Sequence, residues 1–387
     1  MIKLQKMNRE HYHRLGDYIQ LVDVRNRELA VTKLLGVSIS KTFIPSIANT
    51  IGTDMSTYKI VEPYQFAYGP VTSRNGDKIT FALYKGEDKC IVSSAYVTFD
   101  IIDKERLDPD YLMMWALRPE FDRYARFMSN GSAREIFSWE DMCDVYLPVP
   151  DIDTQRRIVA EYQAVEKRIT ANEALIACLK DSAKILFKKL IIDDISLDNL
   201  PVGWSLSTIS EFCKKMTSGG TPNRGIDDYW NGGTIPWIKT GEVQDNIVFQ
   251  AEEFITEEAL KNSSAKMIPA GTVVMAMYGG GTIANIGFLQ LDTTTNQACC
   301  NMICNNYSEA AYLFFHLLYH QEEIRRLANG GAQENLSQEV IGSTSIVKPG
   351  PDFNYSCFTS ILNAIISYSK ENIVNRKILD LLLARLS

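Results

Sequence analysis

The sequence predicts an α+β protein in which two similar mixed α/β domains are joined by two long antiparallel coiled-coil helices, with approximate internal two-fold symmetry. The first observation is a near-repeat about 200 residues apart, a period too long for one unit of a solenoid. The second is a heptad pattern that follows each copy. The repeated motifs are Asn130-Gly131-Ser132-Ala133 with Asn329-Gly330-Gly331-Ala332, Ser138 and Glu140 with Ser337 and Glu339, Tyr111-Leu112 with Tyr312-Leu313, and Pro148-Val149-Pro150-Asp151 with Pro349-Gly350-Pro351-Asp352.

The repeat divides the 387 residues into four expected segments. These are a first domain at 1–150, a central helix at 151–195, a second domain at 196–350 and a C-terminal helix at 351–387. Within each domain, short β-type runs precede one helix, and glycine, proline and asparagine mark the turns. The expected strands are 66–68, 79–84 and 91–99, then 272–278, 286–291 and 298–304, and the expected helices are 109–128 and 308–328.

Both long helices carry apolar residues at alternating steps of three and four, which is typical of a coiled coil. Asparagines within the two patterns suit a pairing of fixed register. We expect the helices to pair with each other, because one follows each domain; the alternative is two amphipathic helices docked on the domains. The seam residues are Ile158, Tyr162, Val165, Ile169, Asn172, Ile176, Leu179, Ala183, Leu186 and Leu190, and Phe358, Ile361, Ile365, Tyr368, Asn372, Asn375, Leu379, Leu382 and Leu386.

Composition limits the class of protein. Hydrophobic residues make up 45% of the chain, enough for packed cores. No apolar run approaches the roughly 20 residues that a membrane helix needs, so we expect no membrane partner. The eight cysteines lack the spacing of a disulfide framework, which favours a reducing, cytoplasmic compartment.

Charge argues against tight nucleic-acid binding by this chain alone. Its net charge is -7, and residues 200–350 carry 9 basic against 15 acidic side chains. Proteins that bind polyanions are usually basic, because phosphate neutralisation supplies much of their affinity. Phosphate contacts to any DNA would therefore come partly from elsewhere.

Motifs for catalysis are few. His316 and His320 are four residues apart but lack the glutamate of a zinc hydrolase motif. Gly279, Gly281 and Ala284 formally fit a dinucleotide fingerprint, yet a strand rather than the required helix is expected next. We find no phosphate-binding loop of the P-loop type and expect no metal and no cofactor. The chain is predicted to be a non-enzyme.

Several loops carry residues suited to contact with DNA. Backbone amides and hydroxyls are common phosphate donors, and glycine allows close approach of another molecule. Plain turn chemistry is the alternative for each of them. The candidates are Lys41, Tyr68, Arg74, Asn75 and Lys78 in the first domain, and Thr217, Ser218, Gly219, Thr221, Lys239, Thr240, Tyr278 and Gly280 in the second.

In combination, these segments resemble the specificity subunits of type I restriction–modification systems, over essentially the whole chain. The resembling motifs are Leu200-Pro201-Val202-Gly203-Trp204, Ser218-Gly219-Gly220-Thr221-Pro222, Tyr229-Trp230, Ile235-Pro236-Trp237-Ile238-Lys239-Thr240-Gly241, Asn296-Gln297-Ala298-Cys299-Cys300, Thr154-Gln155-Arg156-Arg157, Ile158-Val159-Ala160, Leu34-Leu35-Gly36-Val37-Ser38 and Ala48-Asn49-Thr50-Ile51-Gly52-Thr53.

The resemblance implies two target-recognition domains, each reading one half of a split, asymmetric sequence in double-stranded DNA. It implies that the helices set the spacing and dock two adenine-methyltransferase (modification) subunits, and restriction/translocase subunits through that complex. The partner would flip the adenine and transfer the methyl group. Two alternatives remain: a related system with a fused methyltransferase–nuclease partner, and a coiled-coil scaffold that binds protein.

Overall fold

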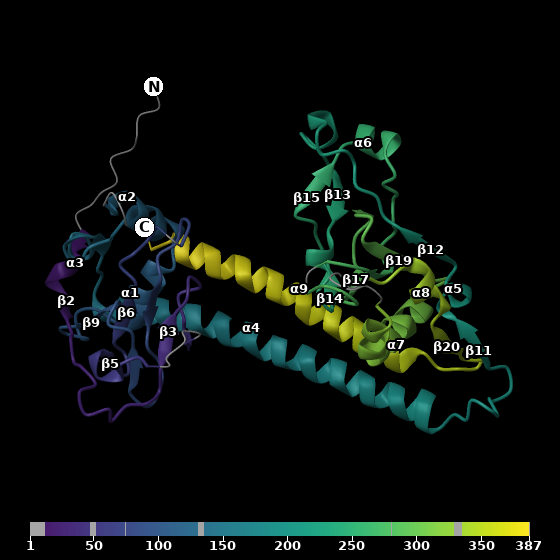
Figure 1. Ribbon diagram of the computed structural model, residues 1–387, viewed down its shortest axis with the longest axis horizontal. Coiled ribbons are helices and arrows are strands. Elements are labelled where there is room, and N and C mark those ends of the chain that lie inside the picture. Colours follow the sequence, from purple (N-terminus) through teal and green to yellow (C-terminus); the bar gives the residue numbers. More distant parts are fainter. Residues whose placement is uncertain are drawn as a thin grey trace. The chain divides into compact units, whose positions relative to one another are not determined.

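The computed structural model describes residues 12–46, 52–73, 75–130, 135–279, 281–328 and 335–386. The chain forms two compact units, one of residues 1–169 and 374–387 and the other of residues 170–373. Each unit therefore contains one mixed α/β domain and a part of both long helices, α4 (Ile152–Phe187) and α9 (Ser356–Ala384) (Figure 1). This confirms the predicted fold class of two mixed domains with two long helices.

Unit 1 is built around the four-stranded sheet β2-β9-β6-β7, in which all neighbours are antiparallel. Smaller pairs β1-β10, β3-β4 and β5-β8 surround it. The elements of the domain are β1 (Tyr12–Arg14), β2 (Ile19–Leu21), β3 (Leu35–Val37), β4 (Phe43–Pro45), β5 (Lys59–Val61), β6 (Phe66–Tyr68), β7 (Phe81–Leu83), β8 (Cys90–Val92), β9 (Val97–Ile101), α1 (Pro109–Ala116), α2 (Pro119–Met128), α3 (Trp139–Cys143) and β10 (Tyr146–Pro148).

Unit 2 has the five-stranded sheet β12-β19-β16-β17-β14 and a second sheet, β15-β13-β18. The strands β13 and β15 and the helix α6 form a lobe of their own in Figure 1, with a separate small core. The elements are β11 (Ser205–Thr208), α5 (Ile209–Phe212), β12 (Lys215–Ser218), β13 (Ile235–Ile238), β14 (Asn246–Val248), β15 (Glu253–Ile255), α6 (Glu257–Asn262), β16 (Val273–Ala276), β17 (Ile286–Leu289), β18 (Thr294–Thr295), β19 (Cys299–Ile303), α7 (Tyr307–Arg326), α8 (Gln338–Ser343) and β20 (Ser345–Lys348).

The single helix predicted at 109–128 is wrong, because the structure has two. Proline lacks an amide hydrogen and disfavours the helical conformation of the residue before it. Arg118, which precedes Pro119, is extended, with ψ of 139°. The run predicted at 91–99 is likewise two strands, β8 and β9. The other expected strands and the helix at 308–328 are confirmed within a few residues.

In unit 2, α7 packs between the sheet and the long helices. Phe314 of α7 contacts Phe288 of the sheet with ring centroids 5.8 Å apart. Phe315, the next residue, lies 5.9 Å from Phe358 at the start of α9. Because α7 contacts both layers through fully buried aromatic rings, it fixes the sheet on the helices.

The two long helices run antiparallel within unit 2. Phe187 at the end of α4 lies 6.2 Å from Phe358 at the beginning of α9, measured between ring centroids. Further along, Asn172 Nδ2 donates a 2.9 Å hydrogen bond to Asn372 Oδ1. Positions thus descend along α4 as they ascend along α9, which confirms the predicted antiparallel pairing. Every predicted seam residue is buried or half-buried.

Candidate nucleic-acid interface

The strand topology of unit 2 brings its predicted contact loops together at neighbouring strand ends of its two sheets. β12 and β16 are both antiparallel to β19, so their carboxyl ends lie where β19 begins. β13 and β18 are parallel and therefore end together. The loops touch: Gly220 N donates to Thr295 O at 2.8 Å, and Asn296 N donates to Ile238 O at 2.9 Å. We call the described residues of segments 217–222, 239–242, 278–282 and 296–297, which leave out Gly280, the loop cluster.

The first loop of the cluster presents hydroxyl groups whose partners are fixed. Thr217 is buried, and its hydroxyl accepts a 3.2 Å hydrogen bond from Lys266 Nζ. Ser218 is half-buried at the end of β12. Thr221 donates its hydroxyl hydrogen to the side-chain oxygen of Gln297, an exposed residue. These contacts join the two segments that the sequence placed 76 residues apart.

Two glycines allow the loops to approach so closely. A Cβ added at Gly219 would lie 2.1 Å from the carbonyl oxygen of Thr295, a clash with backbone. Gly279 has φ of +125°, and a Cβ there would lie 3.3 Å from Thr240 Oγ1. The turn that begins at Tyr278, a half-buried residue, therefore lies against Thr240. Gly280 lies outside the described residues.

The glycine turn does not lead into a dinucleotide site. Strand β17 follows it, as the sequence predicted, and this strand pairs antiparallel with β16. A pyrophosphate site of that type requires a helix N-terminus at this point. The turn is part of a β-hairpin.

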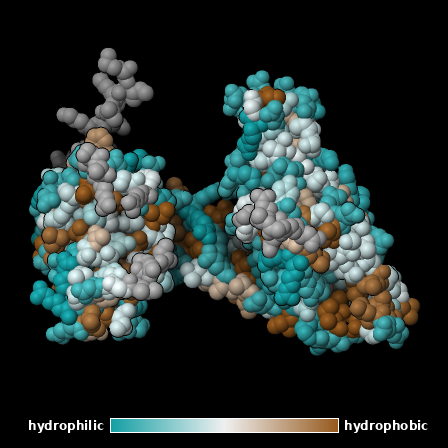
Figure 2. Space-filling model, viewed as in Figure 1, coloured by the Kyte–Doolittle hydropathy of each residue, from teal (hydrophilic) through white to brown (hydrophobic). Residues whose placement is uncertain are grey.

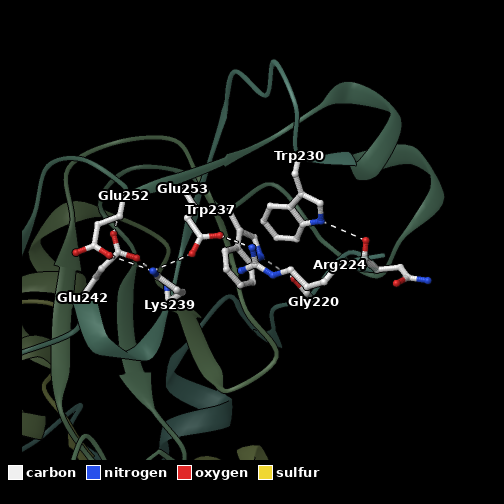
Figure 3. A network of polar contacts seen from close by, with 9 residues as sticks. Gly220, Arg224, Trp230, Trp237, Lys239, Glu242, Glu252 and Glu253 are labelled. Carbon is white, nitrogen blue, oxygen red and sulfur yellow. Dashed lines mark hydrogen bonds and ion pairs between the residues drawn. The ribbon is translucent and has the colours of Figure 1, made fainter. Parts of the chain in front are cut away.

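Lys239 lies at the centre of a network of charged groups (Figure 3). Its ammonium nitrogen is 3.0 Å from a Glu252 oxygen and 2.9 Å from a Glu253 oxygen, and Glu253 also pairs with Arg224. The backbone amide of Lys239 donates to Glu242 at 2.8 Å. The hydrogen bond to Glu253 raises the pKa of Lys239, and the hydrogen bond from Arg224 lowers the pKa of Glu253. Lys239 is therefore charged but already paired.

Arg224 is a site residue that the sequence interpretation missed. Its guanidinium lies over Trp230, 3.6 Å from the ring centroid, and 4.8 Å from the centroid of Trp237. The indole nitrogens are anchored in turn: Trp237 donates to Gly220 O at 2.9 Å and Trp230 to Asn223 O at 3.2 Å. The two tryptophans that carried the resemblance were the available signal for a stacked cation.

Asp245 links the sheet of unit 2 to α7 and α4. Its side chain accepts hydrogen bonds from Ile286 N at 2.8 Å and Gln321 Nε2 at 2.7 Å. Its carbonyl oxygen accepts one from Lys180 Nζ of α4 at 2.5 Å. Asp245 itself has φ of +54°, an unusual conformation outside glycine. One residue just beyond the loop cluster therefore connects the sheet, α7 and the long helix.

In unit 1 the predicted contact residues Lys41 and Tyr68 are buried. Lys41 Nζ is 2.9 Å from an Asp122 oxygen and donates a hydrogen bond to Ala116 O. Burial lowers the pKa of Lys41, and the ion pair with Asp122 opposes that shift. Tyr68 is fully buried, and burial raises its pKa. A contact of Lys41 with DNA would first have to break its buried ion pair, at considerable cost.

A cavity of about 430 Å³ opens beside the end of β6 in unit 1. It is lined by Gly69, Asn75 and Tyr96, among others. Asn75 is half-buried, whereas Lys78 is exposed nearby in the chain. Arg74 lies outside the described residues. The cavity lies beside the carboxyl end of β6, and the Tyr278–Gly279 turn lies at the carboxyl end of β16. These two strands hold equivalent places in their sheets, so the open loops lie at equivalent strand ends in the two units.

Other chemistry is sparse. Within the described ranges, no group of three His, Cys, Asp or Glu residues could hold a metal ion. His316 is fully buried, and its two ring nitrogens have no hydrogen-bond partner among the described residues. Burial lowers its pKa. None of the helices in the described part of the chain has the length and apolar character needed to cross a lipid bilayer.

Comparison with known proteins identifies the second domain. Residues 201–351, which contain the whole loop cluster, match the family model of the type I restriction modification DNA specificity domain. The specificity subunit of the type I restriction enzyme EcoR124I/EcoR124II from Escherichia coli is 24% identical over 274 residues, 68% of this chain and 64% of that protein. The MjaIX specificity subunit from Methanocaldococcus jannaschii is 21% identical over 304 residues, 74% of this chain and 70% of that protein.

The aligned region thus spans slightly less than two thirds of the E. coli subunit. A crystal structure of the type I restriction-modification S subunit from M. genitalium shares the fold, with a TM-score of 0.55 at 14% identity over 97% of this chain and 95% of that chain. Fold and matched segment together define a protein of two mixed α/β domains, the second of which matches a DNA specificity domain. This chain is similar to type I restriction–modification specificity subunits, as its motifs indicated, and residues 201–351 match their DNA specificity domain.

Proposed function

We propose that this chain is the DNA sequence-specificity subunit of a type I restriction–modification complex and has no catalytic activity of its own. Its two domains read the two halves of a split, asymmetric target in double-stranded DNA. The observation that carries the proposal is the loop cluster, which gathers hydroxyls, glycines and a lysine from four segments at neighbouring strand ends of the two unit 2 sheets. The matched DNA specificity domain includes all four segments.

The open loops of unit 1 support a second reading surface. Asn75 lines the cavity at the end of β6 and is half-buried, and Lys78, three residues later in the same loop, is exposed. The loop that carries them differs from the loops of the loop cluster in its length and in its residue types. Different surfaces read different bases, so the two half-sites should differ and the target should be asymmetric.

Exposed apolar side chains favour docking of protein partners on the helical side of each unit. In unit 1, Val374, Ile378 and Leu381 of α9 are 55%, 38% and 64% exposed at helical spacing. In unit 2, hydrophobic atoms gather over the end of α4 and the segment leading into β11 (Figure 2). The exposed residues there include Ile185 and Val202, at 71% and 102%. Apolar patches of this kind mark interaction sites, and we assign them to two methyltransferase subunits, which would in turn hold the restriction/translocase subunits.

The helix pair has a second proposed role, that of fixing the gap between half-sites. Its seam residues Ile158, Tyr162, Val165, Ile169, Asn172, Ile176, Leu179, Leu186, Ile365, Tyr368, Leu379 and Leu382 are buried or half-buried and so keep the helices together. These residues would support partner docking indirectly, because they hold the two helices together and do not themselves contact the partner.

The test is methylation mapping of host DNA after co-expression of this chain with the methyltransferase encoded beside it. We expect a split motif with N6-methyladenine in both halves, absent when this chain is omitted. A stable complex with an unchanged methylation pattern would instead favour a scaffold that binds protein.

Replacement of Lys239 probes the loop cluster within that complex. Lys239→Ala should weaken DNA binding by the assembled complex and reduce the salt dependence by about one counterion, because one phosphate-facing cation is lost. The fold-loss should be small, since Glu252 and Glu253 already engage the ammonium. Lys348→Ala, at an exposed position of β20, is the matched control. Loss of complex assembly by a folded Lys239→Ala protein would contradict this assignment.

A further inference from the structure

We infer that Arg224 is a specificity-determining residue that reads a guanine edge in the major groove, an inference that rests on the proposed DNA-reading function. Arginine presents two N–H donors in one plane, which match the O6 and N7 acceptors of guanine. Four features support this role. Aromatic rings hold the plane of the guanidinium, and one edge of its N–H donors has no partner among the described residues. The group also lies beside the loop cluster, and its neighbours are acidic.

The guanidinium plane is held by aromatic rings. Trp230 lies against it at 3.6 Å and Trp237 at 4.8 Å, measured from the guanidinium carbon to the ring centroids. The two indole planes are nearly perpendicular, at 86°, so they restrict the group from two directions. An exposed arginine normally loses conformational freedom on binding. This one is already ordered, so less of that cost falls on base recognition.

One edge of the guanidinium remains available. Nη1 donates to Glu253, and within the described part of the chain neither Nη2 nor Nε has a hydrogen-bond partner. The Arg224 side chain is 51% exposed although both tryptophans contact it. Glu253 is only 29% exposed and is held from its other side by Lys239. Glu253 therefore orients the guanidinium, and solvent reaches the remaining donors.

Arg224 belongs to the same surface as the loop cluster. Trp237, beneath it, is bonded to Gly220 in the first loop, and Glu253 joins Arg224 to Lys239 in the second (Figure 3). A duplex that meets the hydroxyls and amides of the cluster would have its base edges within reach of the clamped guanidinium. Backbone contacts set the position on DNA, and base contacts set the sequence.

The neighbouring carboxylates favour a base over a phosphate. Glu252 is 70% exposed and Glu253 contacts Arg224 directly, so a phosphate placed here would meet two like charges. A guanine edge is uncharged and presents acceptors only. The same acidic surroundings that oppose phosphate binding thus leave guanine recognition possible.

The experiment maps methylation motifs for complexes assembled with Arg224→Ala and Arg224→Lys. We expect one position that is guanine in the wild-type motif to lose its preference by roughly 10- to 100-fold in both variants, because lysine lacks the planar fork. The other motif positions and the half-site read by unit 1 should not change. Arg326→Ala, an exposed arginine on α7, is the control for loss of charge in unit 2.

The other outcomes overturn the inference in different ways. Uniform weakening at all positions, with a smaller salt dependence and rescue by lysine, would assign Arg224 to a phosphate. An unchanged motif in both variants, with normal complex assembly and thermal stability, would make the clamp purely structural. A wild-type complex that produces no motif at all would refute the proposed function itself, which separates that failure from failure of this inference.

Discussion

Unit 1 and unit 2 share a sheet and differ in what is inserted into it. The strand orders β2-β9-β6-β7 and β12-β19-β16-β17 are equivalent, with the same antiparallel pairings. Each domain closes with a pair formed by its first and last strands, β1 with β10 and β11 with β20. The chain between β2 and β6 of unit 1 contains β3, β4 and β5. The chain between the equivalent strands of unit 2, β12 and β16, contains β13, β14, β15 and α6. The framework is common to both units, and the inserts between these strands differ.

Matched side chains make the comparison finer. Tyr111 donates its hydroxyl to Pro148 O at 3.1 Å in unit 1, and Tyr312 donates to Val347 O at 2.6 Å in unit 2. Four residues further along, Trp115 and His316 both bury a ring nitrogen that has no partner among the described residues. The position is equivalent, but only histidine titrates near neutral pH. The units therefore differ in a chemical property inside a shared framework.

The largest effects should come from truncating one core at a time. Phe99→Ala in unit 1 and Phe288→Ala in unit 2 should each lower the free energy of unfolding by about 3–5 kcal/mol, because both rings are fully buried. Hydrogen exchange should show faster opening in the unit that carries the change. If either substitution opened both units equally, the two cores would not be independent.

Replacement of Asn172 of α4 and Asn372 of α9 tests how strongly the two helices depend on their buried hydrogen bond. Asn172→Leu should cost about 1–3 kcal/mol, because it leaves the buried Asn372 without its donor. The double replacement Asn172→Leu/Asn372→Leu should cost less than either single change. Denaturant unfolding of all four proteins measures the coupling, and simple additivity would contradict it.

The pH dependence should differ between the units at the Trp115/His316 position. The pKa of His316 is lowered from its usual 6.5, so below pH 6.5 the unfolded chain takes up a proton that the folded chain does not. Stability therefore falls as pH decreases, by up to about 1.4 kcal/mol per pH unit. His316→Phe should remove this part of the slope in thermal melts from pH 7 to pH 5. Trp115→Phe serves as control, and an unchanged slope in His316→Phe would refute the account.

The matched tyrosines should give the smallest and most equal effects. Tyr111→Phe and Tyr312→Phe should each lower stability by about 1 kcal/mol, since each removes one largely buried hydrogen bond. Tyr307→Phe, whose hydroxyl bonds to the exposed Asn363, should cost less. A large difference between the two matched replacements would mean that the equivalence of the frameworks is only topological.

Much of the framework could be predicted because it depends on patterns along the chain. The repeated Tyr-Leu motifs predicted equivalent helices, and the alternating steps of three and four predicted α4 and α9 over nearly their full length. The break at Pro119 was missed because the apolar residues on both sides continue a helical pattern. The local backbone preference of proline overrode that pattern.

The site was predicted less completely because it depends on contacts between distant segments. Lys41 has the appearance of a loop cation until Asp122, 81 positions later, is found beside it in the core. Arg224 was overlooked because its importance comes from two tryptophans and a glutamate on β13, β15 and the preceding turn. Neither set of contacts corresponds to a fixed spacing along the sequence, so no sequence pattern predicts it.

Asp245 has a consequence for protein engineering. An exchange of the segment between β12 and β16 for that of another subunit would be the natural way to give unit 2 a new target. Such a graft removes the acceptor for Lys180 and Gln321 together with the old loops. Donor segments that supply an aspartate in the same left-handed turn should be accepted by the host, because the turn presents the carbonyl oxygen to Lys180 of α4 and the carboxylate accepts from Gln321 of α7. Segments that keep the turn but lack the aspartate should produce chimeras with a loosened junction at α7. Compatibility of a graft can therefore be screened at one residue before any target sequence is tried.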